Sequence, residues 1–405
     1  MSQSFSARVE AEGHLIDSGL FSRMLACVLE HGGNYTILRF DVGHRAEDVS
    51  EAELEVRHDS AESLQRVLDN LSALGARVQG REDARVAPAP KDGVAPAGFY
   101  STTNQRTQAR WKGRWVAVEK QRMDAVLVIE GERIYCKKIR DLLAGETVVC
   151  GHLGVRIEPE YQARTSGDFK FMDNEVSSER AVRVRIAQVA RWAREARAAQ
   201  KAIVVVAGPV VVHTGGAEHL EALLRAGWID HLLSGNALAV HDCERAFHGT
   251  SLGVSLETGV PVAEGHMNHM RAINAVRAAG SLAAAVEQGI LKTGVMHACI
   301  QAKVPFVLAG SIRDDGPLPD TEMDLIKAQE AYAKALENAG LVLILSTMLH
   351  GIGVGNMLPA WVRTVCVDIH SAVVTKLNDR GSSQASGIVT DVGLFLDVLR
   401  RELVG

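Results

Sequence analysis

The chain has 405 residues and a formal net charge of −5, and 47% of its residues are hydrophobic and 23% are charged. At roughly 150 residues per domain, this length predicts two or three globular domains, and the composition excludes a wholly disordered protein. Because there is no basic excess, neither nucleic acid nor an anionic membrane surface is an expected partner.

The cysteines and the apolar segments indicate a cellular compartment. The six cysteines form no CxxC pair, which is typical of reduced thiols in a cytosolic protein. The first residues contain no basic segment followed by an apolar core, so no signal peptide is expected. The longest apolar stretches, 202–212 and 341–352, are shorter than the roughly 20 residues that a membrane helix needs. We therefore expect a soluble, cytoplasmic protein.

The first region, 1–90, has the pattern of a small α+β module. Apolar residues at helical spacing follow Ser18 and, later, Ser60, and each serine can cap a helix. Alternating apolar residues at 38–42 and 52–56 predict strands between these helices. The resulting order β-α-β-β-α-β predicts a ferredoxin-like sandwich. Such a module binds a small amino acid, forms a dimer interface, or packs without a ligand.

The second region, 99–175, has the pattern of a small β domain. Residues 86–98 are rich in Ala, Pro and Gly, and we interpret them as the linker that precedes it. Short β-type runs at 126–129 and 148–157 are separated by glycines. Strands of this length with glycine-containing connections predict an all-β unit.

The third region, 176–405, predicts a Rossmann-like α/β domain. It opens with an arginine-rich helix from Ser177 to about Lys201, whose arginines we interpret as a solvated face. Nearly continuous Val, Ile and Leu runs then alternate with helices. These runs lie at 202–208, 231–235, 304–310, 341–347 and 364–370. Such runs indicate parallel strands covered on both faces, and ligands of such sheets bind at the carboxyl ends of the strands.

The loop after the first of these strands, 202–208, contains Gly215 and Gly216. These glycines allow a tight turn whose N–H groups bind an anion, or they form an ordinary strand-to-helix turn. We interpret His213, in the same loop, as a hydrogen-bonding group of the loop rather than a catalytic one.

Asn236 follows the run 231–235, and its position after a glycine predicts a left-handed turn beside a ligand. His241 and Asp242 come next, after a short apolar stretch. They are either a buried structural pair or part of a site.

Glu264, His266 and His269 lie close together in the chain. An HxxH pair without HExxH or added cysteines does not predict zinc, so we expect no metal. Glu264 or His266 is better suited to general acid/base catalysis. The alternative is a helix N-terminus capped by these polar residues.

The loop after 304–310 carries charged residues, and an acid among them suits a substrate amine or a ribose hydroxyl. These residues are Arg313, Asp314, Asp315 and Asp320. Asp320 or Thr321 is also expected to cap a helix over 321–339.

The last loops complete the predicted site. The glycine-rich segment after 341–347 allows a flat ligand to approach the backbone. Asp368 ends the next strand, at the position where an acid binds the ribose diol in NAD enzymes. Asp391 lies in a glycine-flanked loop before a final helix over 394–403. Several such loops at one sheet edge predict a nucleotide site.

Long motifs spread over nearly the whole chain resemble one protein family. They are EGHLIDSG, YSTTN, NEVSSER, VVVAGPVVVHTGG, LSGNALAVHD, AGSIRDDGPLPD, TMLHGIGVGNMLP and GIVTDVG. The chain resembles the archaeal-type ornithine cyclodeaminases. This family is related to the conserved region of lysine-ketoglutarate reductase/saccharopine dehydrogenase and to the C-terminal part of cyanobacterial arginine-guanidine-removing enzymes. Because Met1 lies just before the family's first β-α-β region, the upstream arginine dihydrolase domain of the cyanobacterial enzymes is not expected.

The resemblance implies a tightly bound NAD on a sheet similar to the deoxyhypusine-synthase type of NAD fold. The cofactor-binding residues that it implies are Asn236, Ala237, Asp314, Asp315, Ser346, Thr347, Met348, Leu349, Asp368, Asp391 and Val392. An acid at Asp368 favours NAD over NADP because it repels a 2′-phosphate. The ferredoxin-like module is compatible with a homodimer or homotetramer.

The resemblance also implies that L-ornithine is converted to L-proline and ammonia by hydride abstraction and return. This reaction needs a base, an acid for the departing ammonia and a clamp for the carboxylate. The candidates are Asp242, Glu264 and His266 for proton transfer and Arg313 for the clamp. Two alternatives remain. One is a dehydrogenase that releases NADH from ornithine, lysine or a saccharopine-like substrate, and the other is a non-catalytic sensor of NAD and an amino acid.

Overall fold

The computed structural model of the chain describes residues 5–16, 19–43, 48–78, 82–158, 178–262, 265–314, 316–380 and 385–405. The chain forms two compact units, which are considered separately. The first comprises Met1–Phe169 with Leu358–Trp361, and the second comprises Lys170–Met357 with Val362–Gly405. No described helix is long and apolar enough to cross a membrane.

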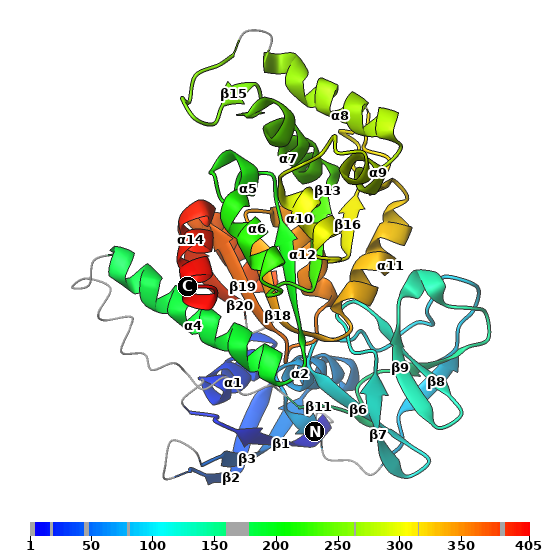
Figure 1. Cartoon of the computed structure of the whole chain (residues 1–405). Coiled ribbons are helices and arrows are strands. Elements are labelled where there is room, and N and C mark those ends of the chain that lie inside the picture. Colours follow the sequence, from blue (N-terminus) through cyan, green and yellow to red (C-terminus); the bar gives the residue numbers. More distant parts are fainter. Residues whose placement is uncertain are drawn as a thin grey trace. The chain divides into compact units, whose positions relative to one another are not determined.

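The first unit begins with the predicted element order β-α-β-β-α-β (Figure 1). Its elements are β1 (Phe5–Gly13), α1 (Leu20–Glu30), β2 (Asn34–Asp41), β3 (Ser50–His58), α2 (Ala61–Ala73) and β4 (Arg77–Val78). The strands pair antiparallel in the order β2-β3-β1-β4. Ala52, Leu54 and Val56 alternate along β3 and are buried in one cluster with residues of α1 and α2. This alternation covers one sheet face with helices and leaves the other polar.

A second sheet of the first unit has seven strands in the order β11-β6-β7-β9-β8-β10-β5. They are β5 (Arg85–Pro88), β6 (Arg106–Trp111), β7 (Arg114–Glu119), β8 (Val126–Glu130), β9 (Arg133–Lys137), β10 (Thr147–Cys150) and β11 (Val155–Glu158), with a short 3-10 turn at Ile139–Asp141. The predicted linker is therefore wrong at its start. Val86 and Ala87 lie opposite Val149 and Val148, and this pairing makes β5 an edge strand.

The second unit contains a parallel sheet of seven strands in the order β17-β16-β13-β12-β18-β19-β20. They are β12 (Ala202–Ala207), β13 (His231–Gly235), β16 (Phe306–Ala309), β17 (Thr321–Glu322), β18 (Ala339–Leu345), β19 (Arg363–Asp368) and β20 (Ala385–Val389). With β12 counted first, the six main strands follow the Rossmann order 3-2-1-4-5-6. The strand order reverses between β12 and β18, which confirms the predicted parallel sheet and fixes its switch point.

Helices cover both faces of this sheet (Figure 1). They are α4 (Ser178–Ala198), α5 (Val210–His213), α6 (Ala217–Arg225), α7 (Asn236–His248), α8 (Asn268–Ala279), α9 (Leu282–Glu287), α10 (Val295–Gln301), α11 (Leu325–Leu336), α12 (Met348–Met357), α13 (Ser371–Arg380) and α14 (Val392–Leu403). Helices α4, α6 and α14 pack together on one face, whereas α11 and α13 adjoin strands on the other and α12 contacts both of these helices. Two short elements remain, the hairpin β14 (Thr250–Ser251) with β15 (Val254–Ser255) and a 3-10 turn at Gly265–Met267.

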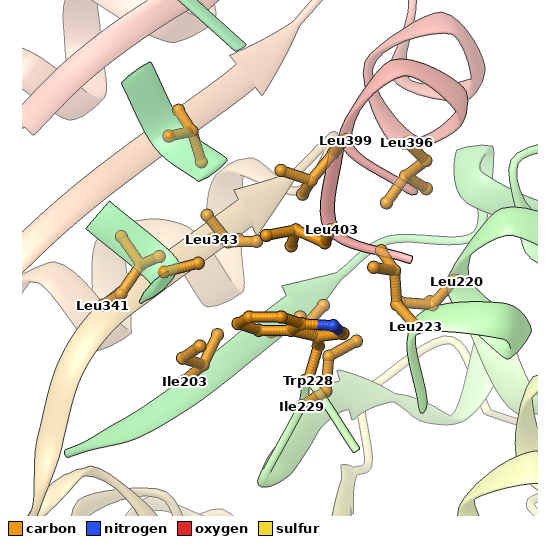
Figure 2. A pocket seen from close by; sticks show the side chains of 13 residues that line it. Ile203, Leu220, Leu223, Trp228, Ile229, Leu341, Leu343, Leu396, Leu399 and Leu403 are labelled. Atoms are coloured by element: carbon orange, nitrogen blue, oxygen red, sulfur yellow. The ribbon is translucent and has the colours of Figure 1, made fainter. Parts of the chain in front are cut away.

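The core between the sheet and α14 is closely filled. Leucines of α14 and the indole of Trp228 converge there over Ile203 and Leu343 (Figure 2). The space that remains is about 10 Å³, which is about the smallest cavity that holds one water molecule. This apolar space is therefore part of the core and not a ligand site.

The helix predicted over 321–339 begins later than expected. Thr321 and Glu322 pair with Leu308 and Ala309 as β17, so the helix starts at Leu325. Asp324 caps it by accepting from the N–H groups of Ile326 and Lys327. Neither Asp320 nor Thr321 therefore caps this helix as predicted. Asp320 instead accepts from the N–H of Leu282 at 2.8 Å.

Candidate functional site

Two backbone segments lie very close together where β12 and β18, the two central strands of the second unit, end. The N–H of Gly208, just after β12, donates to the carbonyl of Leu345 at 2.9 Å. A β-carbon at Gly208 would lie 2.3 Å from the carbonyl oxygen of Ser346, so only glycine fits. Ser346 itself adopts the left-handed conformation, with φ of 47°. A close backbone approach and a strained residue at the switch point of a Rossmann sheet are features of a dinucleotide site.

His350, on α12, lies beside this switch point. Its Nδ1 is 3.0 Å from the hydroxyl of Thr347, and a β-carbon at Gly235 would lie 2.9 Å from its ring. Burial lowers the pKa of His350, and the nearby Asp314 opposes this effect. Met348 and Leu349, at the start of the same helix, are exposed. His350 is not among the residues predicted from the sequence, although a histidine in a glycine-rich loop after a strand is a usable signal.

Asn236 joins two loops at the adjacent strand ends. Its Nδ2 donates to Asp314 Oδ1 at 3.0 Å, and its Oδ1 accepts from the N–H of Leu318 and the hydroxyl of Thr321, both at 3.1 Å. Asp314 also accepts from the N–H of Ser311 at 2.7 Å. The predicted left-handed turn at Asn236 is wrong, because this residue is the first of α7. Its buried amide instead fixes the loop that follows β16.

A pocket of about 480 Å³ opens next to this link. It is lined by Pro209, His213, Asn236, Ala237, Val240, His241, Leu252, His269, Met270, Ile273, Ser311, Arg313, Asp314 and Gly316. Most of its polar groups come from the loop after β16 and from three histidines. Arg313 is exposed at the pocket, where a guanidinium can bind a carboxylate. The pocket therefore combines an apolar wall with a cation and imidazoles.

Two histidines of the pocket contact each other. The rings of His213 and His241 meet edge to face with centroids 4.9 Å apart. His213 Nδ1 is 2.6 Å from the hydroxyl of Ser251, and His241 Nδ1 is 3.1 Å from Glu244 Oε2. Burial lowers the pKa of His213, and His241 adds to this effect. His213 therefore forms a hydrogen bond, but with Ser251 of β14 and not within its own loop as predicted.

Asp242 lies elsewhere. It is fully buried and accepts from the N–H groups of Val295 and Met296 at 2.9 and 2.8 Å, at the start of α10. Burial raises the pKa of its carboxyl to about 6, while those N–H groups and Arg245 lower it. Asp242 is not among the residues that line the pocket. Its contacts are those of a residue that fastens α10 to α7.

Two acidic residues lie at the carboxyl ends of β19 and β20, on the other side of the switch point. Asp368 closes β19, is nearly buried, and accepts from the N–H of His370 at 2.8 Å. Asp391 caps α14 by accepting from the N–H of Leu394 at 3.0 Å, and Val392 is buried beside it. Among the other sequence candidates, Glu264 and Asp315 lie outside the described residues, as does the side chain of His266.

The strand ends fit a dinucleotide on three grounds. Helix α7 begins directly after β13, and α12 begins at Met348, shortly after β18 ends at Leu345, so their N-terminal N–H groups lie at the edge where phosphates bind. Gly208 lets the backbone of Ser346 lie against the end of β12, and this close approach is at the switch point, where a dinucleotide binds such a sheet. Asp368 supplies an acid at the end of β19. The candidates at the strand ends thus share one sheet edge, whereas Asp242 points into the helices.

Family models match three consecutive parts of the chain. Residues 187–399 match the model described as arginine dihydrolase ArgZ-like, C-terminal, Rossmann fold. Residues 6–105 match the LOR/SDH bifunctional enzyme conserved region, and residues 106–186 match the ArgZ-like C-terminal first region.

Relatives match over almost the whole chain. An ornithine cyclodeaminase of Methanocaldococcus jannaschii is 48% identical over 98% of this chain and 96% of its own length. The bifunctional arginine dihydrolase/ornithine cyclodeaminase AgrE of Nostoc sp. is 50% identical over 98% of this chain. The chain spans 58% of the length of AgrE.

Two crystal structures are similar as well. The apo structure of the cyanobacterial arginine dihydrolase ArgZ is 41% identical with a TM-score of 0.87, over 100% of this chain and 59% of ArgZ. The ternary complex of AgrE with ornithine and NAD+ is 49% identical with a TM-score of 0.54, over 99% of this chain and 58% of AgrE. On these matches, the chain belongs to the family of the archaeal ornithine cyclodeaminases and the C-terminal region of the ArgZ-like enzymes.

Proposed function

We propose that this protein is an NAD-dependent ornithine cyclodeaminase, which converts L-ornithine to L-proline and ammonia. The observation that carries the proposal is the match to archaeal ornithine cyclodeaminases at 44–48% identity over 96–98% of the lengths of those relatives. The geometry supports it independently, because a Rossmann switch point adjoins a pocket with a guanidinium and imidazoles.

The proposed division of roles follows the two sides of the switch point. Bound NAD would supply the hydride acceptor and donor for the substrate Cα. Asp368 is suited to the ribose diol, and the N-terminus of α12 is suited to the phosphates. Residues Asn236 and Asp314 hold the loop that borders the pocket. We also assign Asn236, Ala237, Asp314 and the segment from Ser346 to Leu349 to the binding of NAD.

On the substrate side, Arg313 is suited to the carboxylate of ornithine. Holding the carboxylate would let the δ-amine fold back toward C2, and closure of a ring within one bound molecule is favoured by proximity. The apolar wall formed by Val240, Leu252 and Ile273 would exclude water from the imine carbon. We do not include Asp242 among the acids and bases, because its carboxylate is occupied at α10.

The test uses L-ornithine that carries deuterium at Cα. The purified protein is analysed for bound nucleotide by mass spectrometry and then incubated with the labelled substrate, and products are followed by NMR. We expect proline with deuterium at C2, an equal amount of ammonia, and co-purified NAD. An oxo acid with stoichiometric NADH would assign the protein to the dehydrogenases, and ligand binding without turnover would make it a sensor.

We also propose a cytoplasmic homodimer or homotetramer with three domains, 1–90, 99–175 and 176–405. The support for three domains is that each has its own buried cluster and most of one sheet, although the edge strand β5 of the second sheet falls within 1–90. Light scattering measures the assembly, and limited proteolysis tests the boundaries.

A further inference from the structure

Glu244, on α7, is a buried carboxylate with an unusual number of partners. Its side chain is 0% exposed. It accepts from the hydroxyl of Thr250 at 2.9 Å, from the N–H of Leu252 at 3.1 Å and from the N–H of Gly253 at 2.9 Å. Burial raises the pKa of Glu244, but these bonds and His241 lower it further, so that it falls below its ordinary value. The group is therefore an ionised carboxylate inside the protein.

Three of these contacts fasten the β14–β15 hairpin to α7. The fourth partner is His241, which lies one turn earlier on α7 and reaches Glu244 Oε2 with Nδ1 at 3.1 Å. An ionised carboxylate in this place fixes the orientation and the tautomer of that imidazole as well as the hairpin. An ionised carboxylate only accepts, so Nδ1 of His241 carries the proton. The lone pair of the neutral ring is then on Nε2.

His241 lines the pocket, and its side chain is 13% exposed. The neighbouring His213 is held by Ser251 and has a pKa lowered first by burial and then by His241. A charge on His241 therefore disfavours a second charge on His213. The other titratable or charged groups that line the pocket are His269 on α8 and Arg313 and Asp314 on the loop after β16, whereas Asp242 is turned toward α10.

We propose that His241 is the proton carrier of the reaction and that Glu244 is its positioning residue. The inference rests on the proposed ornithine cyclodeaminase function. Nε2 of His241 accepts one proton from the α-ammonium of ornithine, and an N–H bond breaks. After the neutral δ-amine has bonded to C2, the proton that its nitrogen must lose passes to the α-nitrogen, whose bond to C2 breaks as ammonia leaves. Once the hydride is back on C2, the imidazolium gives its proton to the ring nitrogen, so that proline leaves as the zwitterion and the histidine ends in its starting state.

The first test removes the imidazole. His241→Ala is expected to lower kcat for proline formation at least 100-fold, within the range for loss of a general acid/base. Free imidazole has room in a pocket of about 480 Å³ and is expected to restore at least a tenth of the lost rate. The NAD dissociation constant is expected to stay within threefold. His248→Asn, an exposed position on the same helix, is the matched control and should keep full activity.

The second test separates positioning from folding. Glu244→Gln keeps the size of the side chain but removes the charge, so kcat should fall about tenfold and the acidic limb of the kcat/KM profile should move to lower pH. A purely structural role would change the melting temperature and leave the shape of the pH profile unaltered.

The outcomes are distinct. If the wild-type chain forms no proline from ornithine, the proposed function is overturned and this inference with it. If the wild-type chain forms proline and His241→Ala stays within threefold of it, only the inference is overturned. If His241→Ala loses NAD binding instead of turnover, the histidines belong to the cofactor site and the inference is wrong.

Discussion

The amide of Asn236 donates to the carboxylate of Asp314 across 3.0 Å, although the two residues are 78 positions apart. This bond ties the start of α7 to the loop after β16. Both residues border the candidate site. The position of the loop after β16 therefore depends on an amide donor at Asn236 facing the carboxylate of Asp314.

Asn236→Asp should therefore weaken NAD binding at least tenfold at pH 8. The substitution keeps the acceptor for Leu318 and Thr321 but sets two carboxylates within hydrogen-bond distance. Binding should partly recover at pH 5, where a shared proton relieves the repulsion. Titration calorimetry at both pH values measures this effect. Thr321→Val removes a single hydroxyl from the same network and should change the affinity by less than threefold, and equal effects of the two variants would refute the explanation.

Gly208→Ala should destabilise the second unit. The added β-carbon would lie 2.3 Å from the carbonyl oxygen of Ser346, and overpacking of this kind costs about 1–3 kcal/mol. Urea unfolding without nucleotide measures the free energy. Gly353→Ala, inside α12 with no atom within 4 Å of the new β-carbon, is the control and should stabilise by up to about 1 kcal/mol. An unchanged free energy of unfolding for Gly208→Ala would mean that the backbone at Ser346 can shift away from the new β-carbon without cost.

Asp368→Asn should reduce the preference for NAD over NADP at least tenfold. The carboxylate at the end of β19 repels a 2′-phosphate, whereas the amide keeps a hydrogen-bonding group without the charge. Dissociation constants for both nucleotides give the ratio. Asp230→Asn removes one charge beside Arg197, at the opposite end of the sheet, and should leave the ratio as it is. A ratio that falls equally in both variants would indicate a general effect of net charge.

Asp242 should make the stability of the protein depend on pH. Burial raises the pKa of its carboxyl from 3.8 to about 6, so the folded state holds the proton more tightly than the unfolded state. The resulting stabilisation is complete below pH 3.8 and is lost as the pH rises through 6.

The stability of the wild type relative to Asp242→Asn should therefore be about 1 kcal/mol greater at pH 5 than at pH 7, from the 1.36 kcal/mol that each pKa unit represents. Urea unfolding of both proteins at the two pH values measures this difference. A constant difference would show that the carboxyl titrates normally.

The sequence by itself determined the architecture of the second unit and the edge that carries the site. Ile203 to Ala207 are all buried because helices cover both faces of the sheet, and this burial produces the continuous apolar run that predicts a parallel strand. Parallel strands end at one edge, so Asp368 and the segment from Ser346 onward could be expected together. The order of elements in 1–90 was likewise visible, since one buried face gives β3 its alternation.

Only the tertiary structure decided which polar residues face the pocket. His241 and Asp242 are neighbours in the chain, but successive residues on a helix point about 100° apart, so one meets the pocket and the other meets α10. The rotation of α7 is fixed by its packing, which local spacing does not encode. The contact of His350 with Gly235 and the bond from Asn236 to Asp314 likewise join segments that are distant in sequence, and they exist only because parallel strands bring their carboxyl ends together.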